Sequence, residues 1–212
     1  MSNWIYSLKK SLSFRPDHIS AYNLIIEEGT PFFLKARKKQ FISKSESEEI
    51  DFFNLTRSQL IEAGYLHYEI SSFAKSSKEI SRHNYKYWTH TPYLSFGPSA
   101  HSFWDNKRWA NVRSVSSYIE NLKVKNLPVA FKEELNREDL IFEQLFLSLR
   151  TFKGIDLNKF EKTHNHNYLY SHSKYIEQLI KNKFAILENE HFKLTPKGML
   201  LCDEIVSEFA DN

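Results

Sequence analysis

The stretch that decides the fold of this chain is His18-Ile19-Ser20-Ala21-Tyr22-Asn23-Leu24-Ile25-Ile26, which becomes continuously apolar toward its end. A run of this kind is typical of a central parallel strand that is covered on both faces. The turn-forming residues Glu27-Glu28-Gly29-Thr30-Pro31 follow it directly. The sequence therefore predicts a buried strand over residues 18–26.

A helix and a second strand follow. Ser45 and Glu48 can form a capping box at the start of the helix, and Gly64 is well placed to end it. Residues 65–70 then alternate like a strand, so the order strand, helix, strand predicts a βαβ unit and a parallel sheet. Two or three parallel strands leave open edges and half-covered faces. We therefore expect the beginning of a larger barrel to be missing from this chain.

Other elements flank this unit. The first dozen residues predict a helix with Leu8 and Leu12 on one side. Residues 72–92 read as a long loop that is rich in polar and aromatic groups, the kind of segment in which parallel α/β folds keep their chemistry. Residues 93–101 predict a short strand that opens into a turn of small residues, and residues 114–125 predict a helix.

The composition changes near Leu135, which predicts a boundary between a domain over residues 1–134 and a domain over residues 135–212. Three amphipathic segments of the second part predict helices, over residues 136–150, over residues 175–183 and from Pro196 onward. Between the last two, residues 184–195 resemble a hairpin that turns at Asn189-Glu190. This order suggests a small winged-helix-like α+β domain.

Composition excludes several classes of site. The chain has one cysteine, Cys202, which rules out an internal disulfide, a Cys-ligated iron–sulfur cluster or a multi-Cys zinc site built within one chain. A formal net charge of +3 is too small to indicate a nucleic-acid partner. No apolar run is long enough for a membrane span, so we expect a cytoplasmic protein whose membrane association is peripheral at most.

The residues that can carry chemistry gather between positions 83 and 88. His83-Asn84 and Tyr87-Trp88 supply an imidazole, an amide and two broad aromatic faces. Imidazole is a good axial ligand for haem iron, and Tyr and Trp can pack on a porphyrin. The alternative is a structural loop in which His83 bonds backbone groups. His101 follows a turn of small residues, which would let a ligand approach closely, and its alternative is simple strand-to-helix packing. His164-Asn165-His166 is expected at the surface.

Several short sequence motifs, which occur in a fixed order along the chain, resemble those of a known protein family. Residues 18–32 are similar to "HISxYxLxxExGTPF", residues 64–74 to "GYxxYEISNFA", and residues 82–88 to "RHNxxYW". Residues 93–101 resemble "YLGxGxGAHS", with Phe96-Gly97-Pro98-Ser99 in place of a more Gly-rich turn. Asn111-Val112-Arg113 resembles the "NxR" that follows, and residues 194–198 resemble "LTxxG". In this order, the words resemble HemW-type radical SAM haem chaperones, relatives of oxygen-independent coproporphyrinogen III oxidase.

The resemblance implies the fold and the cofactors. It predicts an α/β chain that holds the C-terminal part of a partial TIM-like radical SAM barrel, followed by the small domain. In that family, an N-terminal Cys-x-x-x-Cys-x-x-Cys motif binds a [4Fe–4S] cluster and S-adenosylmethionine, and nothing here matches it. We therefore expect both cofactors only in a full-length family protein, and no radical catalysis by this chain alone.

The resemblance also implies the function. It assigns haem binding to His83, Asn84, Tyr87 and Trp88, with His83 as the metal ligand, and places Ile25 and His101 near the cofactor pocket. We expect a haem-trafficking chain that passes haem to an acceptor protein and that has a possible N-terminal half on another chain. The alternative is a partial coproporphyrinogen III dehydrogenase, an enzyme of porphyrin biosynthesis that needs the missing half.

Overall fold

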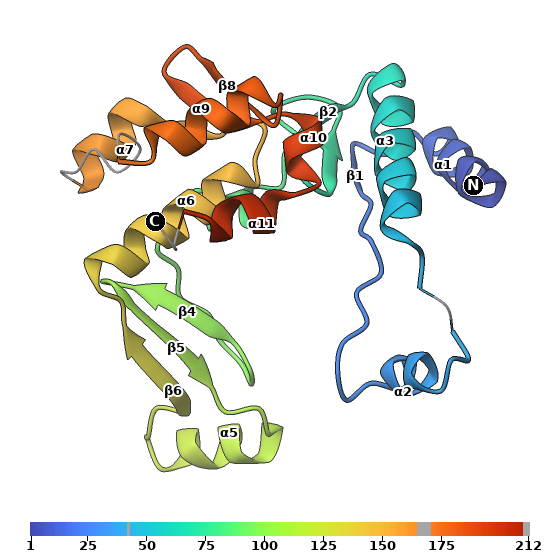
Figure 1. The fold of residues 1–212 in the computed structure, drawn as a ribbon. Coiled ribbons are helices and arrows are strands. Elements are labelled where there is room, and N and C mark those ends of the chain that lie inside the picture. Colours follow the sequence, from blue (N-terminus) through green and yellow to red (C-terminus); the bar gives the residue numbers. More distant parts are fainter. Residues whose placement is uncertain (42, 165–170, 210–212) are drawn as a thin grey trace. The chain divides into compact units, whose positions relative to one another are not determined.

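The computed structural model describes residues 1–41, 43–164 and 171–209. The chain forms two compact units, Met1–Ser81 and Arg82–Asn212, which are treated separately below (Figure 1). The boundary expected between residues 134 and 135 lies inside the second unit and stays a prediction. No helix among the described residues combines the length and the apolar character that a membrane crossing requires.

The core of the first unit forms between two helices and a small sheet. Helix α1 (Ser2–Ser13) and helix α3 (Glu46–Glu62) occupy the segments expected to be helical. Ser45 and Glu48 form the predicted capping box. Gly64 ends the helix in the left-handed region, with a φ of +86°. The buried side chains of this core are Leu8, Leu60, Tyr65 and Phe73, with Trp4, Leu12 and Ile19 packed against them.

The sheet of the first unit corrects the parallel arrangement expected from the sequence. Strands β1 (His18–Ser20) and β2 (Leu66–Glu69) run in the same direction, but they do not pair. Strand β3 (Ser72–Ala74) lies between them and pairs antiparallel with each. The tight turn after β2 explains the difference, because it returns the chain beside β2 and β3 takes the place that a parallel neighbour would need.

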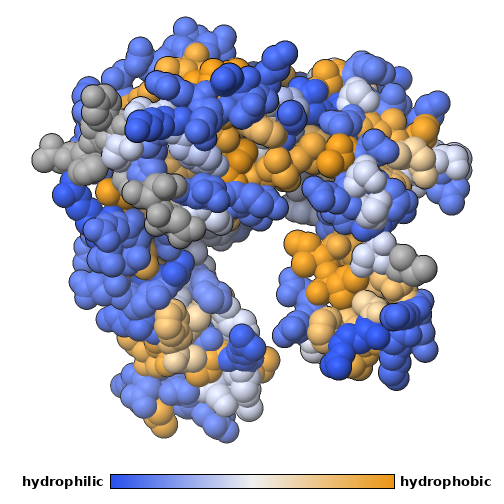
Figure 2. Space-filling model, viewed as in Figure 1, coloured by the Kyte–Doolittle hydropathy of each residue, from blue (hydrophilic) through white to orange (hydrophobic). Residues whose placement is uncertain are grey.

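The expected strand over residues 18–26 is much shorter than predicted. Only β1 pairs, and residues 21–27 are extended without ladder partners. Leu24 and Ile25 are exposed, so the prediction of burial on both faces is wrong for this segment. Helix α2 (Pro31–Arg37), which was not expected, follows with Thr30 as its N-cap and Pro31 in its first turn. Figure 2 shows apolar surface gathered over this segment and α2.

The second unit begins with a helix where a loop was expected. Helix α4 covers Arg82–Trp88 and lies against helix α6. A three-stranded antiparallel sheet follows, with the order β4-β5-β6 and with helix α5 (Val115–Lys123) between its last two strands in sequence (Figure 1). Its strands are β4 (His101–Trp104), β5 (Lys107–Asn111) and β6 (Val129–Glu134). Tyr93 adds an isolated bridge to Phe103, in place of the short strand expected there.

The remainder of the second unit follows the sequence-based expectation closely. Helix α6 (Arg137–Leu149) forms in the segment predicted to be an amphipathic helix, and it buries Ile141, Leu145 and Leu149 at helical spacing along one stripe. The predicted hairpin forms and turns at Asn189 and Glu190, both at positive φ, as a two-residue hairpin turn requires. Its strands, together with a short third strand, form the sheet β7-β9-β8, made of β7 (Ile155–Asp156), β9 (His191–Leu194) and β8 (Ala185–Glu188).

Several helices among the described residues accompany this sheet. They are α7 (Leu157–His164), α9 (Ser173–Lys181), α10 (Pro196–Met199) and α11 (Cys202–Ser207). The last two divide the single helix expected from Pro196 onward, because Leu200 and Leu201 lie in a turn between them. Cys202, Ile205, Val206 and Phe209 are buried, as their spacing predicts.

Candidate functional site

Helix α4 positions two of the four residues expected to bind haem. His83 and Tyr87 lie one helical turn apart, and residues at this spacing face each other on a helix surface. The Tyr87 hydroxyl lies 3.2 Å from His83 Nε2, and the two rings meet edge to face with centroids 5.3 Å apart. The His83 side chain is exposed. The helix thus presents an imidazole whose orientation is set by a neighbouring phenol.

Tyr87 is in turn held against the sheet of the second unit. Its ring meets the Tyr93 ring edge to face, with centroids 4.7 Å apart. Tyr93 exchanges two backbone hydrogen bonds with Phe103 on β4. Burial is the main cause that raises the pKa of the Tyr93 phenol above its ordinary value, and the nearby Tyr87 raises it further. Tyr93 therefore stays neutral and joins α4 to the sheet.

Asn84 and Trp88 lie on a different side of α4. Successive residues of an α-helix are rotated by about 100°, so this pair is turned away from His83 and Tyr87. The Trp88 ring contacts the Arg150 guanidinium, whose carbon lies 5.6 Å from the ring centroid, and Arg150 is also paired with Asp203 at 2.7 Å. The structure thus divides the four expected residues between two sides of the helix.

The Trp88 side borders a small cavity of about 120 Å³. Tyr85, Gln144 and Ser148 are among its lining residues. The Trp88 indole N–H is buried, and no described residue accepts a hydrogen bond from it. Such a donor can bind a water molecule or a small acceptor group.

A charged network that the sequence did not indicate anchors the end of α4. His90 Nε2 lies 3.2 Å from Glu143 on α6, and the His90 ring stacks on Phe103 at 4.5 Å. Arg108 on β5 donates to Glu143 at 2.8 Å and also pairs with Glu133 on β6. Glu143 is 35 positions from Arg108 and 53 positions from His90 in the sequence. Only the packing of the sheet against α6 brings these side chains together, so no local pattern could have revealed the network.

Burial and pairing act in opposite directions on Glu143. Burial alone would raise the pKa of its carboxyl group, but the His90 hydrogen bond and the Arg108 charge outweigh it, so the pKa lies below the ordinary value. The carboxylate is therefore ionised at neutral pH and bridges α4, α6 and the sheet.

His101 and Ile25, the residues expected near the cofactor pocket, lie in different units of the chain. His101 lies on β4 opposite Ala110, with its side chain exposed. Ile25 belongs to the first unit and is 75% exposed. Its neighbours Leu24 and Ile26 line a cavity there, but Ile25 does not. Of the other expected histidines, His164 is half-buried and binds Gln144, and residues 165 and 166 lie outside the described residues.

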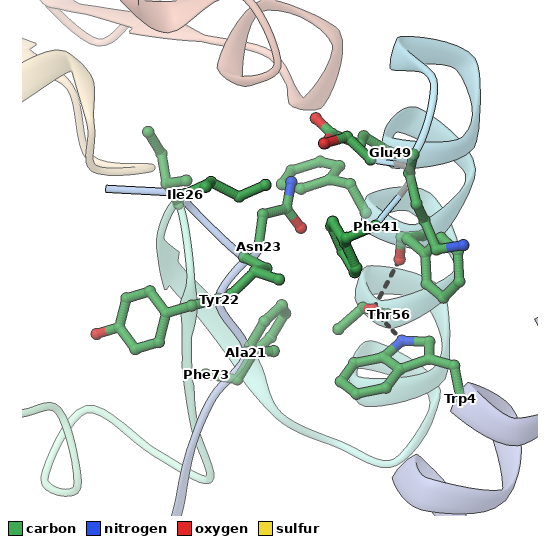
Figure 3. Close-up of a pocket in the computed structure, with 15 residues that line it drawn as sticks. Trp4, Ala21, Tyr22, Asn23, Ile26, Phe41, Glu49, Thr56 and Phe73 are labelled. Atoms are coloured by element: carbon green, nitrogen blue, oxygen red, sulfur yellow. Dashed lines mark hydrogen bonds between the residues drawn. The ribbon is translucent and has the colours of Figure 1, made fainter. Parts of the chain in front are cut away.

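The cavity of the first unit has a volume of about 460 Å³ and lies between α3 and the extended segment after β1 (Figure 3). Its walls are largely aromatic, with Trp4, Phe41, Phe52, Phe53 and Phe73 among them. Trp4 Nε1 donates to Thr56 Oγ1 at 2.8 Å, and Thr56 donates to the Phe52 carbonyl at 2.7 Å. Phe53 and Thr56 lie one helical turn apart on α3, a spacing that is as typical of a helix's core face as of a cavity wall, so no local pattern could have revealed this cavity.

Metal-binding groups are sparse in the part of the chain that the structure describes. Among residues 1–41, 43–164 and 171–209, no three His, Cys, Asp or Glu side chains gather as a metal site. Cys202 is buried on α11, and burial raises the pKa of its thiol to about 12.

Comparison with known proteins identifies the relatives of this chain. The family model of the HemN C-terminal domain matches residues 135–201. "Heme chaperone HemW" of Bacillus subtilis is 29% identical over 204 residues, which cover 96% of this chain and 54% of that protein. The protein of the same name from Lactococcus lactis is 29% identical over 202 residues, covering 95% of this chain and 52% of that protein. This chain is homologous to the HemW and HemN proteins.

A solved structure agrees with the fold. The radical SAM enzyme HemN, coproporphyrinogen III oxidase of Escherichia coli, superposes with a TM-score of 0.73 and 20% sequence identity. The match covers 97% of this chain and 50% of that chain, so the α/β fold is similar to the C-terminal part of HemN. The chain spans about half the length of the curated HemW relatives that it matches.

Proposed function

We propose that this chain binds haem through the His83 imidazole and serves in haem trafficking. The observation that carries the proposal is the exposed His83 ring, whose Nε2 atom is held 3.2 Å from the Tyr87 hydroxyl. A histidine that ligates a metal commonly has its second ring nitrogen in a hydrogen bond, which fixes the tautomer and the ring orientation. The relatives named as haem chaperones support haem as the ligand.

The contact between His83 Nε2 and the Tyr87 hydroxyl can form with either tautomer of the His83 ring. When Nε2 carries the proton and donates it to the Tyr87 oxygen, the Nδ1 lone pair is left to bind iron. When Tyr87 donates instead, Nε2 is occupied and Nδ1 carries the proton. We propose that haem selects the first arrangement, in which the Tyr87 oxygen accepts a hydrogen bond from the Nε2–H group of the ligating ring.

The proposal extends to the full-length protein. We propose that residues 1–134 belong to a partial TIM-like barrel and residues 135–212 to a winged-helix-like domain. The sheet β7-β9-β8 and the helices beside it support the second of these assignments. We propose that the full-length protein is cytoplasmic. It would hold a [4Fe–4S] cluster and S-adenosylmethionine in a segment that corresponds to the unmatched part of the relatives, either on the same chain or on a second chain. It would pass haem to an acceptor protein.

A haem titration followed by visible absorption tests the proposal. We expect saturable binding with a shifted Soret band for the unaltered chain, and loss of that shift in His83→Ala. His191→Ala, in the β8–β9 hairpin of the same unit, is the matched histidine control and should bind like the unaltered chain. Equal spectra for His83→Ala and the unaltered chain would rule out His83 as the ligand.

A further inference from the structure

The aromatic cavity of the first unit has walls whose polar groups are already bonded at one end. Its volume of about 460 Å³ lies in the range of pockets that bind small molecules. The rings of Trp4 and Phe52 border it, with centroids 6.4 Å apart. The Trp4 N–H donates to Thr56, and the Thr56 hydroxyl donates to the Phe52 carbonyl. This end of the cavity therefore offers a ligand aromatic surface, because both of these donors are in use.

The wall also holds an ammonium group against one of its rings. Lys44 Nζ lies 4.9 Å from the centroid of the Phe52 ring. A cation over an aromatic face is attracted by the electrons of the ring. Lys44 is paired with Glu48 at 3.7 Å as well, and Glu48 does not line the cavity. The aromatic wall is thus suited to cations, and the charge of its own cation is balanced from outside.

Two polar side chains lie at the end of the cavity away from Trp4. Figure 3 shows the Asn23 amide and the Glu49 carboxylate reaching toward this end from opposite sides, Asn23 from the extended segment after β1 and Glu49 from α3. In the part of the chain that the structure describes, no hydrogen bond or ion pair engages either side chain. An amide can donate and accept, whereas a carboxylate only accepts. Glu49 therefore leaves a negative charge unpaired beside aromatic rings.

We propose that this cavity binds an organic amine, which is a protonated amino group attached to an apolar body with an aromatic ring. The amino group donates to the Glu49 carboxylate and to the Asn23 side-chain oxygen. The ring packs among the aromatic side chains of the wall. Both parts are needed for this match, because an anion is repelled by Glu49 and a neutral molecule leaves its charge unpaired. The site belongs to the first unit and does not depend on haem binding by His83.

Isothermal titration calorimetry of the whole chain tests the class of ligand with three molecules of similar size. They are 2-phenylethylamine, which is a cation at neutral pH, the neutral 2-phenylethanol and the anionic 3-phenylpropionate. We expect 2-phenylethylamine to bind about tenfold more tightly than either of the others, because a hydrogen bond to a charged group is stronger than a neutral one. Binding of 3-phenylpropionate as tight as that of the amine, or no binding of the amine at millimolar concentrations, would overturn the inference.

Two substitutions in the first turn of α3 place the amine in this cavity. Glu49→Gln removes the charge and keeps the shape of the side chain, so the affinity for 2-phenylethylamine should fall about tenfold. Glu46→Gln is the matched control, because Glu46 lies in the same turn and does not line the cavity. It should bind the amine like the unaltered chain. Both glutamates are exposed, so neither substitution should unfold the helix.

Asn23→Ala, on the opposite side of the cavity, should weaken the binding of 2-phenylethylamine about fivefold, which corresponds to the loss of one hydrogen bond. Circular dichroism of each variant verifies that the helices have formed. Equal affinities of Glu49→Gln and Glu46→Gln for the amine would show that it binds elsewhere, and the assignment of this cavity would then be wrong.

Discussion

The Tyr87 hydroxyl lies 3.2 Å from His83 Nε2, one turn apart on the same helix. This relationship exists because α4 is helical, since an extended loop would not bring residues at this spacing together. A segment that looks like a loop in the sequence is therefore ordered at the position where its chemistry would need order. Removal of the Tyr87 hydroxyl should therefore weaken the function proposed for His83.

Tyr87→Phe removes the hydroxyl and keeps the ring that packs on Tyr93. A neutral hydrogen bond contributes about 1 kcal/mol, so we expect haem affinity to fall by roughly fivefold. The visible spectrum should keep its His-ligated form, which distinguishes this variant from His83→Ala. Unchanged affinity in the titration would show that Tyr87 does not orient the ligating ring.

Glu143→Gln should destabilise the second unit by roughly 1–2 kcal/mol at pH 7, because Arg108 and His90 lose their shared carboxylate. The folded pKa of Glu143 lies below its ordinary value. Its stabilising contribution is therefore complete above the unfolded pKa and is lost as the pH falls through the folded pKa.

Urea unfolding at pH 7 and at pH 4 measures this difference. The gap between the unaltered chain and Glu143→Gln should narrow at the lower pH. Glu188→Gln, which breaks an exposed pair with Lys193, is the control and should change little. A gap that is the same at both pH values would contradict the assignment of the ionised carboxylate.

Because of the buried His67 ring, we expect the first unit to lose stability at acidic pH. Its ring stacks on Phe73 with centroids 4.0 Å apart, and burial lowers its pKa to about 4. The unfolded chain binds the proton near the ordinary value of 6.5, so stability is lost as the pH falls from about 6.5 toward 4, by up to about 3 kcal/mol. His67→Phe keeps an aromatic stack without a titrating group.

Hydrogen exchange of residues 66–74 at pH 7 and pH 5 follows this unit alone. Protection should fall at pH 5 in the unaltered chain and fall less in His67→Phe. A pH dependence that is the same in both would assign the acid sensitivity to other groups.

Gly198→Ala should destabilise the C-terminal part of the second unit by about 2 kcal/mol or more, because a Cβ at this position would lie 2.0 Å from the Phe184 carbonyl oxygen. Gly64→Ala is the comparison in the first unit. Its Cβ would meet nothing within 4 Å, so only the cost of its positive φ, about 1 kcal/mol, applies. Thermal unfolding measures both, and a smaller effect at Gly198 than at Gly64 would show that α10 shifts freely away from β8.

Sequence patterns predicted the elements whose signals are local. The capping box of Ser45 and Glu48, the buried stripe of α6 and the turn at Asn189-Glu190 are confirmed, because helix caps, helical periodicity and tight turns are decided within a few residues. The sequence motifs shared with HemW-type proteins likewise predicted the homology that the comparison with known proteins shows. The roles of the six expected site residues stay predictions: His83, Asn84, Tyr87, Trp88, Ile25 and His101.

Tertiary structure alone decided how the strands of the first unit pair and which distant side chains meet. The antiparallel insertion of β3 between β1 and β2 depends on a turn whose outcome no strand pattern contains. The meeting of His90, Arg108 and Glu143 depends on the register of the sheet β4-β5-β6. Register is set by long-range packing, since a shift of one residue would move every side chain to the other face. The sequence by itself determined the local elements and the candidate ligand, and packing determined the surroundings in which that ligand acts.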